Sequence, residues 1–324
     1  MASPKIAPYR ILSIDGGGLR GIISLAILEN LDAAVPGWRD RINMFAGTST
    51  GGLIALGLAK GFTASQLLDT YMRQGPHVFE RSLWHEIKDI GDVIGPKYDS
   101  DNRQKVVESI LDPALQLGQL RRDEDERGHV VITAFDLDDL AQQDAAKRRW
   151  KAKIFHNLPT KDGSGDDRER ASRVAMRTSA APTYFASSDG FVDGGVFANN
   201  PGMCALAQTQ DPRLSVSIPF ETIKMLSIGT GFFPFHLEGE ESWGLAQWAP
   251  HLVDLLMDGV NEVADFQVAQ MLPDGNYLRL APQLLANIAM DDARKVGALQ
   301  AIGNNFPIDD PRPGKSAVAF VRGW

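Results

Sequence analysis

The chain has 324 residues, of which 44% are hydrophobic and 23% are charged, proportions typical of a globular protein that buries a full core. Its 41 acidic residues outnumber its 33 basic ones, and the resulting net charge of −8 disfavours binding to a nucleic-acid polymer. With one cysteine, Cys204, the chain cannot form an internal disulfide. The N-terminal segment lacks the apolar core of a signal peptide, and no apolar run has the length of a membrane-spanning helix. We therefore expect a cytoplasmic protein.

Strands and helices are predicted to alternate along the chain. Apolar runs bounded by turn residues predict strands at residues 9–14, 43–47, 129–135, 150–155, 190–192, 223–228 and 277–280. Apolar periodicity predicts helices at residues 19–34, 170–179 and 243–271, one that follows the second strand and ends at residue 59, and one that begins at residue 200. The capping box of Thr63 and Gln66 predicts the start of a further helix. This alternation favours a mainly parallel sheet covered on both faces. We expect one three-layer α/β domain over residues 1–324, with helical additions after residue 231.

The first candidate for a functional loop is Asp15-Gly-Gly-Gly-Leu-Arg-Gly21, between the first predicted strand and helix. Consecutive glycines keep side chains out of the approach path, and amides beside a helix N-terminus favour an anion. In acyl transfer that anion is the oxyanion of the tetrahedral intermediate. The pattern Gly16-x-Gly18-x-x-Gly21 also matches a dinucleotide-binding fingerprint, so this turn alone leaves both uses open.

The second candidate is Gly47-Thr-Ser-Thr-Gly51, which has the Gly-x-Ser-x-Gly pattern of a nucleophile elbow between a strand and a helix. Small neighbours permit the strained turn that lifts the Ser49 hydroxyl out of the sheet, and the Thr50 amide is a further candidate oxyanion donor. The alternative is a serine that only caps the helix. The triple-glycine turn upstream favours a hydrolase, because an oxyanion loop followed by the nucleophile is the order of α/β hydrolases.

The third candidate is Asp193-Gly194-Gly195, directly after a short apolar strand. An Asp-Gly pair most often marks a turn without a chemical role. An aspartate at the end of a strand beside two glycines can, however, approach another loop closely. Asp193 is therefore the candidate acid or base of the site.

Together, residues 15–21, 47–51 and 193–195 resemble the signature motifs of the patatin-like phospholipase family, in the family's order within residues 9–231. The resemblance implies a three-layer α/β/α fold and a lipid acyl hydrolase that needs no metal or other cofactor. Its partner would be a lipid substrate, reached by transient contact with a membrane or micelle. The implied site residues are Ser49 as nucleophile, Asp193 as base, Gly16, Gly17 and Gly18 as oxyanion hole, Arg20 as support of that loop, Gly47 and Gly51 at the elbow, and Gly194 and Gly195 beside the acid.

A Ser–Asp dyad is chemically reasonable only if the aspartate is buried. An ordinary carboxylate, with a pKa of ~3.9, is a weak base for an alcohol, but burial raises that pKa and a direct hydrogen bond positions the proton. A Ser-His-Asp triad remains an alternative, with His236 a better candidate than His251, which falls in a predicted helix. Two further alternatives are the same hydrolase acting as a membrane-degrading effector gated by a small nucleotide signal, and a nucleotide-binding protein that uses residues 16–21.

Overall fold

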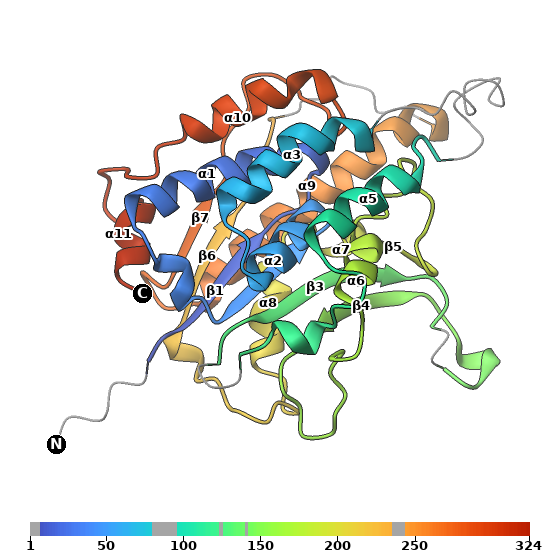
Figure 1. The fold of residues 1–324 in the computed structure, drawn as a ribbon, viewed down its shortest axis with the longest axis horizontal. Coiled ribbons are helices and arrows are strands. Elements are labelled where there is room, and N and C mark those ends of the chain that lie inside the picture. Colours follow the sequence, from blue (N-terminus) through green and yellow to red (C-terminus); the bar gives the residue numbers. More distant parts are fainter. Residues whose placement is uncertain (1–6, 80–95, 123–125, 140–141, 235–243) are drawn as a thin grey trace.

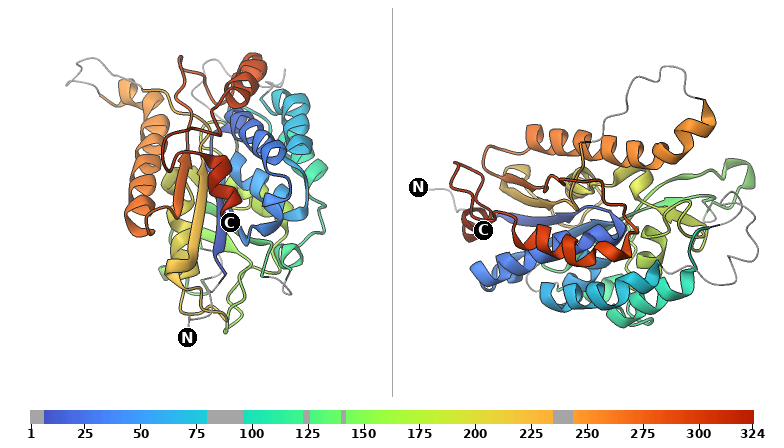
Figure 2. Two further views of the ribbon diagram at one scale, coloured as in Figure 1. Left: turned by 90° about the vertical axis from the view of Figure 1, so that its left-hand side faces the viewer. Right: turned by 90° about the horizontal axis from the view of Figure 1, so that it is seen from above.

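A central sheet lies between two layers of helices (Figure 1, Figure 2). The structure is a computed structural model that describes residues 7–79, 96–122, 126–139, 142–234 and 244–324. The strands are β1 (Tyr9–Ile14), β2 (Met44–Thr48), β3 (His129–Asp136), β4 (Lys151–His156), β5 (Phe191–Asp193), β6 (Ile223–Ile228) and β7 (Tyr277–Leu280). The predicted strands are confirmed, with bounds that shift by at most one residue. The α/β fold class is therefore confirmed.

The helices divide between the two faces of the sheet. They are α1 (Gly21–Ala34), α2 (Thr50–Lys60), α3 (Ala64–Val78), α5 (Ser100–Ile110), α6 (Ala171–Thr178), α7 (Gly195–Ala198), α8 (Gly202–Thr209), α9 (Leu245–Met271), α10 (Val296–Asn304) and α11 (Ala317–Arg322). The long helix α9 covers one face together with α8, and α1, α2, α3 and α10 cover the other (Figure 2). The sequence patterns did not predict α5 or α7, and they gave no bounds for α10 and α11, which lie among the helical additions expected after residue 231. Among the described residues, no helix is both long and apolar enough to cross a bilayer.

The sheet runs β4-β3-β2-β1-β6-β7, and β5 pairs with β3 outside this order. The strands β3, β2, β1, β6 and β7 are all parallel to one another, whereas β4 and β5 both run antiparallel to β3. β4 occupies one edge of β3, so β5 must share the other edge with β2. The pairing of β2 ends at Thr48 opposite Thr133, and the pairing of β5 begins at Asp193 opposite Ala134. β5 therefore lies end to end with β2 along the same edge of β3, with its chain running in the opposite direction.

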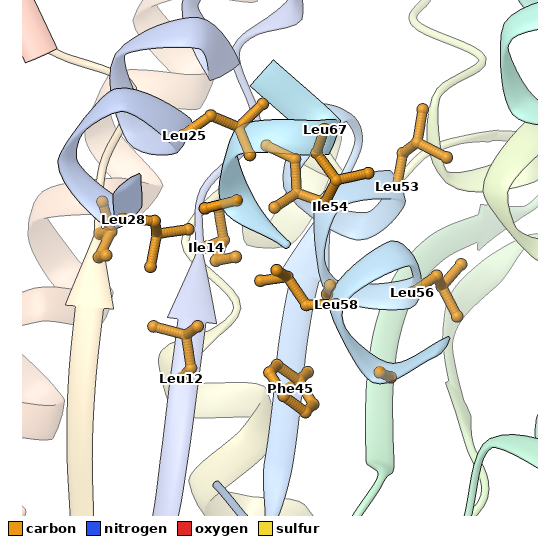
Figure 3. Packing of buried hydrophobic residues seen from close by; sticks show 14 of the residues in the cluster. Leu12, Ile14, Leu25, Leu28, Phe45, Leu53, Ile54, Leu56, Leu58 and Leu67 are labelled. Atoms are coloured by element: carbon orange, nitrogen blue, oxygen red, sulfur yellow. The ribbon is translucent and has the colours of Figure 1, made fainter. Parts of the chain in front are cut away.

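Alternation along the central strands gives each face its own core. Leu12 and Ile14 of β1 and Phe45 of β2 face the large cluster beneath α1 and α2 (Figure 3). Residues next to them along the strands, Ile11 of β1 and Met44 and Ala46 of β2, belong to the smaller cluster beneath α8 and α9. Because successive side chains of a strand point to opposite faces, the mainly apolar sequences of β1 and β2 are explained by burial on both sides. This two-sided core fixes the carboxyl ends of β1 and β2, where the candidate loops begin.

Candidate active site

Ser49 lies at the turn from β2 to α2 in a backbone conformation that non-glycine residues seldom adopt. Its φ is 55° and its ψ is −124°, and its backbone amide donates to Oγ1 of Thr178 at 2.8 Å. A Cβ atom at Gly51 would lie 2.2 Å from the carbonyl oxygen of Ile14, so glycine is required where the first turn of α2 crosses β1. The predicted strained elbow is present. The strain costs of order 1–3 kcal/mol and persists only where the surroundings enforce it.

Asp193 lies at the end of β5 and faces the same pocket as Ser49. Only 3% of the residue is exposed, and its Oδ1 accepts a hydrogen bond from the Gly195 amide at 2.7 Å. Burial raises the pKa of Asp193 to about 6. Hydrogen bonds from the Ser49 hydroxyl and the Gly195 amide and the charge of Arg103 each lower this pKa and so limit the increase. This carboxyl group therefore has the proton affinity of a general base that works near neutral pH.

The glycine loop after β1 packs directly against Ser49. A Cβ atom at Gly16 would lie 3.2 Å from the Cβ of Ser49 and 2.1 Å from Oδ1 of Asn199. The Gly16 amide donates to the Asn199 carbonyl at 3.0 Å, so its proton is already engaged. The amides of Gly17 and Gly18 donate to no atom of the described residues. Of the three amides predicted to bind an oxyanion, these two are available.

Contacts from distant segments hold this loop in place. Leu19 donates its amide to the Met290 carbonyl at 2.8 Å, and the Arg20 amide closes the turn onto Gly17 at 3.0 Å. Asp15 is 1% exposed and accepts hydrogen bonds from two guanidinium nitrogens of Arg279 on β7. The sequence patterns indicated neither Met290 nor Arg279. Support of the loop by the Arg20 side chain stays a prediction.

The pocket above Ser49 and Asp193 is mainly apolar. It is formed on one side by α2, α3 and α5 and on the other by the segments that follow α6, with Met257 added from α9. Its apolar lining includes Leu19, Leu53, Val78, Phe79, Val106, Val107, Ala181, Phe185 and Met290. Tyr71 also lines it, with its hydroxyl donating to the Thr50 carbonyl at 3.1 Å. Such a pocket suits a hydrocarbon chain whose ester group reaches the serine.

The two histidines of the triad alternative lie outside the described side chains. His236 lies outside the described residues, and the side chain of His251 on α9 is not described. No histidine is among the described residues that line the pocket. In the same part of the chain, His, Cys, Asp and Glu side chains form no group of three or more that could hold a metal ion.

Comparisons with known proteins agree with the motifs. The family model of patatin-like phospholipases matches residues 12–205. Patatin-like protein 2 from Oryza sativa subsp. indica is 30% identical, over 90% of this chain and 81% of its own. A cGAMP-activated phospholipase from Vibrio cholerae is 28% identical, over 97% of this chain and 94% of its own. The solved structure of VipD from Legionella pneumophila aligns with 98% of this chain and 67% of its own, at 12% identity and a TM-score of 0.41. This chain belongs to the patatin-like phospholipase family.

Proposed function

We propose that the chain hydrolyses fatty-acyl esters of phospholipids or related lipids through an acyl-enzyme on Ser49, with Asp193 as the base. The observation that carries the proposal is the placement of Ser49, in its strained turn, and buried Asp193 in one apolar pocket. Family membership supports the reaction class, lipid acyl hydrolysis. The residue roles follow from the local chemistry.

Acylation needs one proton to move twice. The Asp193 carboxylate takes the proton of the Ser49 hydroxyl as Oγ attacks the ester carbonyl carbon, and the carbonyl oxygen becomes an oxyanion. The amides of Gly17 and Gly18 are free to donate to that oxyanion, and each such donor typically contributes about 3–4 kcal/mol to transition-state stabilisation. The intermediate then breaks the bond to the leaving alcohol, which receives the proton from Asp193.

Deacylation repeats these steps with water as the nucleophile. Asp193 takes a proton from water, the hydroxide oxygen attacks the acyl carbon, and Ser49 leaves with the proton that Asp193 returns. The products are a free fatty acid and, from a phospholipid, a lysophospholipid. The apolar side chains of the pocket would surround the acyl chain during both half-reactions.

The test compares wild type with Ser49→Ala, Asp193→Asn and His236→Ala, each checked for folding, on p-nitrophenyl esters and phospholipid vesicles. We expect both dyad variants to lose activity and His236→Ala to keep it. The Ser49 and Asp193 losses should be non-additive, because either substitution alone disables the same step. Loss in His236→Ala as well would replace the dyad with a triad.

A second candidate is the same hydrolase held inactive until a small nucleotide binds. The similarity to a cGAMP-activated phospholipase spans nearly the full length of both chains, which favours testing it. Vesicle hydrolysis would be measured with and without cGAMP and other cyclic nucleotides. Activity that appears only with a nucleotide supports gating, and equal activity in all samples rejects it.

A further inference from the structure

Arg103 is a buried cation inside the candidate active-site pocket. It lies on α5 and lines the pocket together with Ser49 and Asp193, and only 5% of the residue is exposed. A charged side chain is rarely buried to this degree without a partner, because removing it from water is costly. Its contacts therefore show what the pocket is built to accept.

Only one corner of the Arg103 guanidinium is engaged by the described residues. Nη1 donates to the Ser179 carbonyl, and Cζ lies 4.5 Å from the ring centroid of Phe185. Nε and Nη2 are buried and have no hydrogen-bond partner among the residues that the structure describes. These two nitrogens form the side-on edge of the guanidinium, the edge whose parallel N–H groups match two oxygens of a carboxylate or phosphate.

Within the pocket, the carboxylate of Asp193 interacts electrostatically with Arg103. Burial lowers the pKa of Arg103 to about 10, while Asp193 raises it, so the guanidinium stays positive at neutral pH. The two side chains form no ion pair among the described residues, and Oδ1 of Asp193 is engaged by the Gly195 amide. The side-on edge of Arg103 is therefore left for another anion.

We propose that the Nε–Nη2 edge of Arg103 binds an oxygen anion of the lipid inside the pocket. Two parts of a lipid carry such an anion: the headgroup phosphate of a phospholipid and the carboxylate of the released fatty acid. The phosphate lies a few bonds from the ester carbon that Ser49 attacks, and the carboxylate forms on that carbon itself. The inference rests on the proposed function, and it makes Arg103 a specificity residue that the motifs do not indicate.

The test separates the two sources with matched ligands. Arg103→Met removes the charge at similar length, and Arg103→Lys keeps the charge without the fork. Values of kcat/KM are compared on dihexanoylphosphatidylcholine and dihexanoylglycerol, which differ in the phosphate headgroup. Binding of decanoate and decanol is measured by calorimetry on the Ser49→Ala chain with and without Arg103→Met. Arg39→Met, which removes a half-buried arginine paired with Asp32 outside the pocket, is the control for folding.

A phosphate site predicts that Arg103→Met lowers kcat/KM on the phosphatidylcholine roughly ten- to hundred-fold more than on the diacylglycerol. A carboxylate site predicts a similar weakening of decanoate binding with decanol unchanged. In either case Arg103→Lys should recover only part of the loss. Equal losses on both esters together with unchanged decanoate binding would overturn the proposal and leave Arg103 a structural residue. If wild type hydrolyses neither ester, with or without cyclic nucleotides, the proposed function fails, whereas calorimetry still decides the anion site.

Discussion

Arg279 and Asp15 form a buried two-pronged ion pair that joins β7 to the glycine loop. Nη1 of Arg279 donates to Oδ1 of Asp15 at 2.9 Å and Nη2 donates to Oδ2. Nη1 also donates to Oγ of Ser227 at 2.8 Å. Asp15 lies two residues before Gly17, so this ion pair anchors the start of the loop that carries the available amides of Gly17 and Gly18.

Replacing one member of the ion pair should lower the free energy of unfolding more than replacing both members. Arg279→Met leaves the Asp15 carboxyl buried without its cation, and we expect a loss of about 3–5 kcal/mol in the free energy of unfolding. The double variant Asp15→Asn/Arg279→Met should recover part of that loss, because no buried charge remains. Denaturant unfolding of the single and double variants measures both values. Strictly additive losses would show that the two side chains do not act as a pair.

The rate of hydrolysis should follow the ionisation of Asp193. Its pKa is about 6, and in the proposed mechanism the carboxylate is the form that accepts the Ser49 proton. We expect kcat/KM on an uncharged ester to rise about tenfold per pH unit below 6 and to level off above it. A flat profile between pH 5 and 8 would contradict Asp193 as a base with this pKa.

Asp193→Asn should stabilise the fold while abolishing activity. The folded pKa lies above the reference value of 3.8, so the folded state holds the proton more tightly than the unfolded chain. Stability is therefore lost as pH rises from about 4 to about 6, by roughly 3 kcal/mol in all. The neutral amide avoids this loss, so denaturant unfolding should favour the variant at pH 8 and show little difference at pH 4. A variant that is less stable at pH 8 would count against a buried, ionised Asp193 that destabilises the fold.

Gly51 should tolerate no side chain. A Cβ atom there would overlap the Ile14 carbonyl at 2.2 Å, whereas one at Gly259 in α9 meets nothing within 4 Å. We expect Gly51→Ala to cost on the order of 3 kcal/mol or more and to remove activity. Gly259→Ala, the matched control, should gain roughly 0.5–1 kcal/mol from helix propensity. Thermal unfolding and ester hydrolysis measure both, and an active, stable Gly51→Ala would refute the close crossing of α2 and β1.

Thr63 should contribute to stability without affecting catalysis. Its Oγ1 accepts from the Gln66 amide at 3.1 Å, and the Gln66 side chain accepts from the Thr63 amide at 2.9 Å. We expect Thr63→Ala to cost about 0.5–2 kcal/mol and to leave kcat/KM unchanged. Denaturant unfolding beside the ester assay checks this, and a large fall in kcat/KM would link the start of α3 to the site.

The features that the sequence predicted are those encoded over short stretches of chain. The strands β1 and β2 follow from apolar runs, the turn at Ser49 from its flanking glycines, and the start of α3 from the capping box at Thr63. Each depends on residues a few positions apart, so the local pattern is sufficient. The helix α5 shows the limit, because its four buried residues among eleven gave no clear signal beside the polar residues around them.

Only the tertiary structure determines how the site is assembled. Asp193 reaches Ser49 because a three-residue strand, β5, pairs with β3 in line with β2, and so short a strand carries no signal for its partner. Arg103 and Arg279 lie on elements that are distant in sequence from the turn at Ser49. The sequence pattern around each of them is typical of a surface residue. The local sequence sets the shape of each candidate turn. The distance between the turns depends on long-range strand pairing and burial. The whole core, and not any single segment, determines the free energies of that pairing and burial.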